Sequence, residues 1–320
     1  MYTLAIIGFV IGAVVGSFLN VVVWRLPRGM SLVTPPSTCP KCGHRIRPWE
    51  NIPIVSWVFL GGKCSSCHLP ISWKYPAGET AAGILYALIA VRVYREGLPL
   101  STMFPWFWFA GAILAVARTD FESHVIPNVV TYSGMAAALA FSLLLPYTRP
   151  ALAAPGNPDF GTLLTEKLVT AIRGMAMPHA AADRIAALAD CVLGLLLGWL
   201  LLEIVYQAGV KVLAAIRRRK GDKGDAIPSE PLGRGDIKML AMTGAFLGCD
   251  AVVFLLAGGT LLGFLGAIVS LGIPRRQKQT STPATCAQVP FAPYFAVPAL
   301  IWVVGGNWFY ILYKSFASGY

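Results

Sequence analysis

The chain contains 320 residues, of which 56% are hydrophobic and only 13% are charged, and its mean hydropathy is +0.64. A soluble domain carries about 25% charged residues, so the composition excludes an ordinary soluble enzyme and indicates a membrane protein with several spans. The net charge of +11 would suggest nucleic-acid binding in a soluble chain. Because basic and aromatic residues do not interleave along any one segment, we expect a lipid bilayer and no nucleic acid as partners.

The first apolar run extends from Leu4 to Val23, and about 20 residues are enough for a helix to cross a bilayer. No basic residue precedes this run and no A-x-A cleavage site follows it, so the pattern is not that of a cleaved signal peptide. We therefore predict a first transmembrane helix that stays in the protein.

Apolar runs along the rest of the chain predict an all-α polytopic membrane protein with about eight transmembrane helices. The predicted spans are 4–24, 79–95, 102–118, 127–146, 187–212, 237–249, 251–272 and 291–313. The sixth is short, and its junction with the seventh, near Gly248 to Asp250, is the least defined boundary. We expect a first helix (1–24), a polar domain (25–78) and a membrane core (79–320), with an outer-side insert at about 147–186.

The distribution of basic residues predicts the orientation of these spans. Most of the 26 Lys and Arg fall in four segments that eight spans place on one side, namely 25–78, 119–126, 213–236 and 273–290. The positive-inside rule assigns this side to the cytoplasm. Both termini are then expected outside.

Four of the seven cysteines form two C-x2-C pairs in the polar domain, Cys39 with Cys42 and Cys64 with Cys67. Both pairs lie in turn-rich sequence next to glycine, and two such turns can supply four thiolates to a tetrahedral Zn2+. Four thiolates leave no open position for water, so this zinc would be structural. A polar segment of about 50 residues can form only a small hydrophobic core, so a bound metal would help to stabilise its fold.

Two disulfides or a catalytic thiol pair would use the same four cysteines. The expected cytoplasmic location disfavours disulfides because that compartment is reducing. No neighbouring helix start or group of basic side chains favours a reactive thiol. His44 and His68 flank the pairs, and we expect them beside the metal rather than bound to it.

Acidic residues are rare near the predicted spans, and a carboxylate at a membrane edge indicates a functional site by default because it is costly to bury. The candidates are Glu79, Asp120, Glu122, Asp190, Glu203, Asp236 and Asp250. Asp120 follows the third span and Asp236 precedes the sixth, so the expected topology places both at the cytoplasmic edge. Asp190 and Asp250 map to the opposite edge, where Asp250 is well placed to cap the seventh helix.

Asp120 and Asp236 are therefore a candidate catalytic pair. Two close carboxylates share one proton, so the ionised one can take a proton from water while the neutral one donates to a scissile carbonyl. Gly233 and Gly235 would let a substrate backbone approach closely. Simpler interpretations remain open, with Asp236 as a helix N-cap and Asp120 as a solvated loop acid paired with Arg118.

Other classes of function have less support. The sequence contains no G-x-S-x-G, H-E-x-x-H or Walker motif, and its four histidines have no metal-ligand spacing. A non-enzymatic membrane scaffold or transporter with a zinc-stapled loop is the main rival. A transporter would place its polar groups near the middle of the bilayer, whereas both candidate aspartates map to an edge.

The two aspartates and the four cysteines lie in segments with a recognisable pattern, namely Gly16 to Pro27, Cys39 to His44, Pro48 to Pro53, Gly62 to Cys67, Asp120 with Ile126 to Asn128, Gly233 to Leu240, and Pro290 to Tyr294. Together these segments resemble the bacterial type IV prepilin peptidases, a family also called prepilin leader peptidase/N-methyltransferase. The resemblance covers nearly the whole chain.

The resemblance implies a GxGD-type aspartic endopeptidase of the bacterial inner membrane, with Asp120 and Asp236 as its catalytic pair and the four paired cysteines as ligands of structural Zn2+. Its substrates would be type IV prepilins or type II secretion pseudopilins, cleaved at the cytoplasmic face. S-adenosylmethionine would then serve to N-methylate the new N-terminus. Because no glycine-rich fingerprint marks a site for this methyl donor, methylation rests on the resemblance alone, and a peptidase without it remains an alternative.

Overall fold

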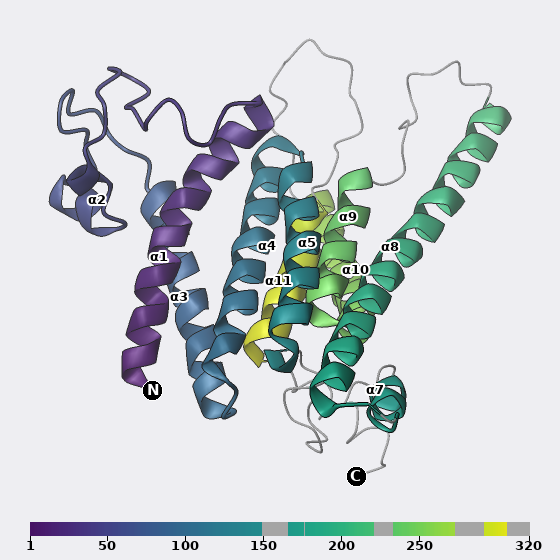
Figure 1. Ribbon diagram of the computed structural model, residues 1–320. Coiled ribbons are helices and arrows are strands. Elements are labelled where there is room, and N and C mark those ends of the chain that lie inside the picture. Colours follow the sequence, from purple (N-terminus) through teal and green to yellow (C-terminus); the bar gives the residue numbers. More distant parts are fainter. Residues whose placement is uncertain (149–165, 176, 221–232, 273–290, 306–320) are drawn as a thin grey trace.

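The computed structural model describes residues 1–148, 166–175, 177–220, 233–272 and 291–305, and the regular secondary structure of these ranges is helical (Figure 1). The long helices are α1 (Tyr2–Arg25), α3 (Lys74–Arg95), α4 (Met103–Ser123), α5 (Asn128–Leu144), α8 (His179–Lys220), α9 (Arg234–Leu247), α10 (Cys249–Gly272) and α11 (Ala292–Gly305). Each predicted span coincides with one of these helices, so the all-α prediction is confirmed.

Shorter elements connect the long helices. They are η1 (Leu26–Arg28), η2 (Pro48–Asn51), α2 (Val55–Phe59), η3 (Leu100–Thr102), η4 (Pro146–Thr148) and α7 (Glu166–Arg173). The predicted junction between the sixth and seventh spans is a break at Gly248, whose φ of 86° favours glycine. Most of the expected insert, the segment 273–290 and the end of the eighth predicted span lie outside the described residues.

The composition of the helices is that of a multi-pass membrane protein. Four described stretches are long and apolar enough to cross a membrane, namely Tyr2–Arg28, Lys74–Arg95, Leu100–Ser123 and His179–Ile216. Three shorter apolar helices are Asn128–Leu144, Ala251–Gly266 and Ala292–Gly305. Apolar side chains such as Ile6, Val10 and Val14 are exposed on α1, as expected for a surface that faces lipid.

Glycines bring α1 and α3 into close contact. A Cβ added at Gly8, Gly12 or Gly16 would lie 2.8 Å or less from backbone atoms of α3. The spacing of four residues places all three glycines on one face of α1. In a membrane, where helices gain little from burying apolar surface, such close approach supplies the packing energy.

Glycines also bring the backbones of α8 and α9 into close contact. A Cβ added at Gly194 would clash with the carbonyl oxygen of Gly244, and one at Gly198 would lie 2.6 Å from that of Leu240. Because both backbones are in contact, α9 has little freedom to slide or rotate. This contact matters for the site because Asp236 lies in the first turn of α9.

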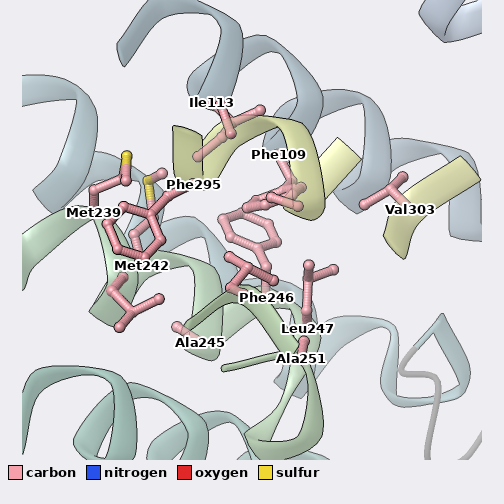
Figure 2. Close-up of a cluster of buried hydrophobic side chains, with 14 of the residues drawn as sticks. Phe109, Ile113, Met239, Met242, Ala245, Phe246, Leu247, Ala251, Phe295 and Val303 are labelled. Carbon is pink, nitrogen blue, oxygen red and sulfur yellow. The ribbon is translucent and has the colours of Figure 1, made fainter. Parts of the chain in front are cut away.

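The core lies where α4, α9, α10 and α11 meet. Figure 2 shows Phe109 of α4 and Phe246 of α9 approaching each other, with Phe295 of α11 beside Met239 and Met242. The rings of Phe109 and Phe246 are 5.3 Å apart between centroids, and the side chain of Phe109 is fully buried. Aromatic pairs at this distance contribute about 0.5–1.5 kcal/mol beyond the burial of their area.

Segments that are far apart in sequence meet at one end of the bundle. The C-terminal end of α4 and the first turns of α9 and α11 lie at the same end as the connection between α1 and α3, and Met1 lies at the opposite end (Figure 1). We call this connection, residues 26–73, the Cys loop.

Candidate active site and metal centre

Asp120 lies inside α4, one turn before the helix ends. Its side chain is 7% exposed, and its Oδ2 accepts a 3.0 Å hydrogen bond from the backbone N–H of Ala292. His124, with φ 53°, ends the helix by donating its N–H to the carbonyl oxygen of Asp120. The interpretation of Asp120 as a solvated loop acid is therefore wrong, because α4 extends five residues beyond the apolar run ending at Arg118.

Asp236 is the third residue of α9, and Gly233 occupies the N-cap position. The N-cap interpretation of Asp236 is therefore wrong. Asp236 is 5% exposed, and its Oδ1 is buried with no hydrogen-bond partner among the described residues. A buried polar atom without a partner is costly, and it calls for a functional explanation.

The structure brings these two acids to the same end of the bundle, where their carboxyl groups interact electrostatically. Each comes from a different helix, and α4 packs against both α9 and α11. Lys238, two residues after Asp236 on α9, donates a 2.7 Å hydrogen bond to Oδ1 of Asn128 at the start of α5. This bond joins the segment that carries Asp236 to the segment that follows Asp120.

The expected role of Gly235 is corrected by the structure. A Cβ at Gly235 would lie 2.7 Å from the Cβ of Ile126, so this glycine admits the α4–α5 connection and is not open to a substrate. At Gly233 the nearest atom to an added Cβ is Oδ2 of Asp236, at 3.1 Å. Gly235 therefore serves the close packing around Asp236, whereas Gly233 is exposed.

The arrangement suits acid–base chemistry. Two buried carboxyl groups that interact electrostatically cannot both ionise easily, so one retains a proton. Such a pair can activate water and protonate a carbonyl in one step. Among the described residues, the His, Cys, Asp or Glu cluster that could hold a metal is the cysteine cluster, which does not include either aspartate.

The other acidic candidates fall elsewhere. Glu79 is buried in α3, where it accepts a hydrogen bond from the Cys loop, and Glu122 is exposed on α4. Asp190 of α8 lies beside Gly248, at the α9–α10 junction. The helix α10 begins at Cys249, so Asp250 does not occupy its N-cap position, and the side chain of Asp250 lies outside the described part of the chain.

The four paired cysteines form a compact cluster, as predicted. Their sulfur atoms all lie within 4.8 Å of one another, with 4.0 Å between Cys39 and Cys67 and between Cys42 and Cys64. All four are free thiols, so the disulfide alternative is wrong for this structure. In a tetrahedral site with Zn–S bonds of about 2.3 Å the sulfur atoms would be about 3.8 Å apart, so the cluster can hold such a metal.

The two C-x2-C turns have the same local structure. The N–H of Cys39 bonds the carbonyl of His44, and that of Cys64 bonds the carbonyl of Leu69. Gly43 and His68, which end the turns, both have positive φ, 72° and 54°. Backbone N–H groups of Cys42 and Lys41 stabilise the Cys39 thiolate and lower its pKa to about 6.

His44 lies beside the cluster, and the group of side chains placed to hold a metal consists of the four cysteines. Its Nε2 is 3.3 Å from both Oε2 of Glu50 and Oγ of Ser65. The Arg47 N–H, the Ser65 hydroxyl and His44 together hold the pKa of Glu50 below its usual range. These bonds connect the two C-x2-C turns outside the sulfur cluster.

The contribution of Ala292 was not found from the sequence. Ala292 lies in the segment Pro290 to Tyr294, but its methyl group offers no chemistry. The group that contacts Asp120 is the backbone N–H of Ala292. A helix start leaves such N–H groups without partners inside the helix. That general rule was the only available signal, and it does not identify the acceptor.

Comparisons with known proteins agree with this arrangement. The profile of the family described as "Bacterial Peptidase A24 N-terminal domain" matches residues 10–93. The chain is 30% identical to the prepilin leader peptidase/N-methyltransferase of Pseudomonas aeruginosa, with 96% of this chain and 92% of the relative covered. The chain belongs to the prepilin leader peptidase/N-methyltransferase family.

Other family members match over similar lengths. The protein of the same description from Stutzerimonas stutzeri is 30% identical, covering 96% of this chain and 93% of the relative. The Myxococcus xanthus member is also 30% identical, covering 88% of this chain and 68% of the relative. No solved structure matches the chain.

Proposed function

We propose that this chain is a membrane aspartic endopeptidase that removes the leader peptides of type IV prepilins or type II secretion pseudopilins and N-methylates the new N-terminus. The observation that carries the peptidase proposal is the meeting of Asp120 and Asp236, two buried acids from separate helices, at one end of the bundle. The names of the relatives supply the substrate class and the methyl transfer.

In the proposed reaction, one carboxylate takes a proton from water as the water attacks the scissile carbonyl. The neutral partner donates its proton to the carbonyl oxygen. The hydrogen bond from Ala292 favours Asp120 as the ionised member, because a helix start stabilises negative charge. Asp236, whose Oδ1 has no hydrogen-bond partner within the described ranges, then offers the group that meets the substrate.

We further propose that the four cysteines of the Cys loop hold structural Zn2+. The sulfur spacing and the matched turns support this assignment. Cys39, Cys42, Cys64 and Cys67 would all be ligands, so the metal would stabilise the loop and would not activate water.

S-adenosylmethionine would be the donor for the methyl transfer. The Cys loop and the aspartates would face the cytoplasm, as the distribution of basic residues predicts. A chain that cleaves without methylating is the second candidate, because methylation is supported by the names of relatives alone.

Mass spectrometry of a processed substrate tests these proposals together. The purified chain in detergent is incubated with a full-length prepilin, with and without S-adenosylmethionine. We expect a single cleavage in both samples and a mass increase of about 14 Da at the new N-terminus only with the donor. An unmethylated product in both samples would refute the proposed methyltransferase activity. An intact prepilin would refute the proposed peptidase activity.

A further inference from the structure

Glu79 is a buried acid that is not a member of the proposed catalytic pair. It lies in the second turn of α3 and is 8% exposed. Its Oε2 accepts a 2.7 Å hydrogen bond from the N–H of Ile54 in the Cys loop, and its Oε1 lies 3.5 Å from Nδ2 of Asn20 on α1. One carboxylate therefore joins the Cys loop to two membrane helices.

The backbone of Ile54 is strained where it meets Glu79. Its φ of 64° and ψ of −52° form a γ-turn, in which the N–H of Val55 bonds the carbonyl oxygen of Pro53 at 2.5 Å. A positive φ is a genuine outlier for a β-branched residue, and this turn is rare and strained. Such strain persists only where the surroundings hold it in place, and here the carboxylate of Glu79 accepts the hydrogen bond from the N–H of Ile54 itself.

The contact lies beside the helix that carries Asp120. Arg118, two residues before Asp120 on α4, interacts electrostatically with Glu122, Tyr75 and Glu79. A Cβ at Gly78 would lie 2.6 Å from Nη1 of Arg118, so this glycine admits the guanidinium against the start of α3. The Cys loop, α1, α3 and α4 therefore meet around one buried carboxylate.

We propose that Glu79 is a positioning residue that docks the Cys loop on the membrane helices, next to the end of α4 that carries Asp120. The hydrogen bond to Ile54 fixes where the loop sits, and the strained turn is the part of the loop that reaches it. Docking does not depend on the proposed peptidase activity. Its effect on substrate presentation does rest on that activity.

The first test measures the exposure of the loop. Glu79→Ala removes the acceptor, Glu79→Gln keeps an oxygen for the Ile54 N–H, and Glu122→Ala removes a neighbouring acid that does not touch the loop. Trypsin is applied to the folded protein, and cleavage at Lys41, Arg45 and Lys63 is followed. We expect roughly tenfold faster cleavage in Glu79→Ala, rates within about threefold of wild type in Glu79→Gln, and no change in Glu122→Ala.

The second test is a double-mutant cycle with Ile54→Gly. Glycine adopts a positive φ without strain, so the turn should form with less help from Glu79. Glu79→Ala should therefore raise the rate of loop cleavage by a factor about three times smaller in the Ile54→Gly background than in wild type. The metal content of the same samples should be equal, which separates undocking of the loop from loss of its metal.

Kinetics connect docking to function. A loop that moves freely would change how substrate reaches the aspartates, while the aspartates and Ala292 stay in place. We expect the KM of Glu79→Ala to rise several-fold with kcat within about twofold of wild type. An unchanged rate of loop cleavage or an unchanged KM in Glu79→Ala would each overturn the proposal. Loop cleavage in Glu79→Gln as fast as in Glu79→Ala would also overturn it. If the wild type cleaves no prepilin, the proposed function fails and the trypsin comparison still decides whether Glu79 docks the loop.

Discussion

The backbone N–H of Ala292 donates a 3.0 Å hydrogen bond to Oδ2 of Asp120, although the two residues are 172 positions apart. The N–H belongs to the first residue of α11, where the helix itself offers no acceptor. The carboxylate of Asp120 therefore completes the start of another helix. In return, the helix start holds that carboxylate in place and favours its charged form.

Replacement of Ala292 by proline removes this N–H without touching either aspartate. Proline is tolerated at the first position of a helix, so α11 should still form. Because a hydrogen bond to a charged group contributes about 1.5–3 kcal/mol, we expect prepilin cleavage to slow by roughly tenfold or more. Ala292→Gly keeps the N–H and is the matched control. Equal cleavage rates in Ala292→Pro and wild type would show that this bond does not matter for the reaction.

Replacement of Gly235 by alanine tests the close packing around Asp236. The new Cβ would lie 2.7 Å from the Cβ of Ile126, which forces α9 and the α4–α5 connection apart. We expect a loss of activity of roughly 100-fold, since a displacement of about 1 Å at a catalytic group has this effect. Gly263→Ala is the control, because its nearest neighbour would be an atom of Phe291 at 3.9 Å. Wild-type cleavage by Gly235→Ala would contradict the packing argument.

Single Cys→Ser substitutions at positions 39, 42, 64 and 67 test the metal centre. Each removes one of four ligands, so we expect zinc content to fall from about one per chain to near zero in all four variants. The long helices pack directly against one another, so the helical circular dichroism signal should remain. Cys249→Ala, which alters a buried cysteine outside the cluster, should keep its zinc. Full zinc content in any two of the four variants would rule out a four-thiolate site.

The pH dependence of Cys39 follows from its backbone hydrogen bonds. Its pKa is lowered to about 6, so in metal-free protein its thiolate is present above this pH and is lost as the pH falls through it. We expect alkylation of Cys39 by iodoacetamide, located by peptide mass mapping, to have a midpoint near pH 6. An ordinary thiol has its midpoint near about 8.5. A midpoint near the ordinary value would mean that the N–H groups of Lys41 and Cys42 do not stabilise the thiolate.

The sequence was sufficient to predict what depends on local pattern. The eight helices follow from long apolar runs, and the cysteine cluster follows from the spacing of two C-x2-C pairs. Both signals are carried by residues close to one another in the chain. The depth of Asp120 and Asp236 in the membrane, which rests on counting spans and basic residues along the whole chain, stays a prediction.

Contacts between distant segments were not predictable in the same way. The Asp120–Ala292 bond uses a backbone group, and the Glu79–Ile54 contact depends on a strained turn that no isoleucine-containing pattern predicts. Helix ends were also misplaced at Asp120 and Asp236, because the polar residues there continue the helices beyond the apolar runs. Gly235 was read as open backbone, whereas tertiary packing against Ile126 uses its missing side chain.

The central claim is that Asp120 and Asp236 act as one catalytic pair. Prepilin cleavage is therefore measured for Asp120→Asn, Asp236→Asn and the control Glu203→Gln, each purified in the same detergent and checked for helical content. Both Asn variants should be folded and show no cleavage, because neither can complete the proton transfers alone, while Glu203→Gln should cleave at the wild-type rate. Wild-type cleavage by either Asn variant would contradict the claim.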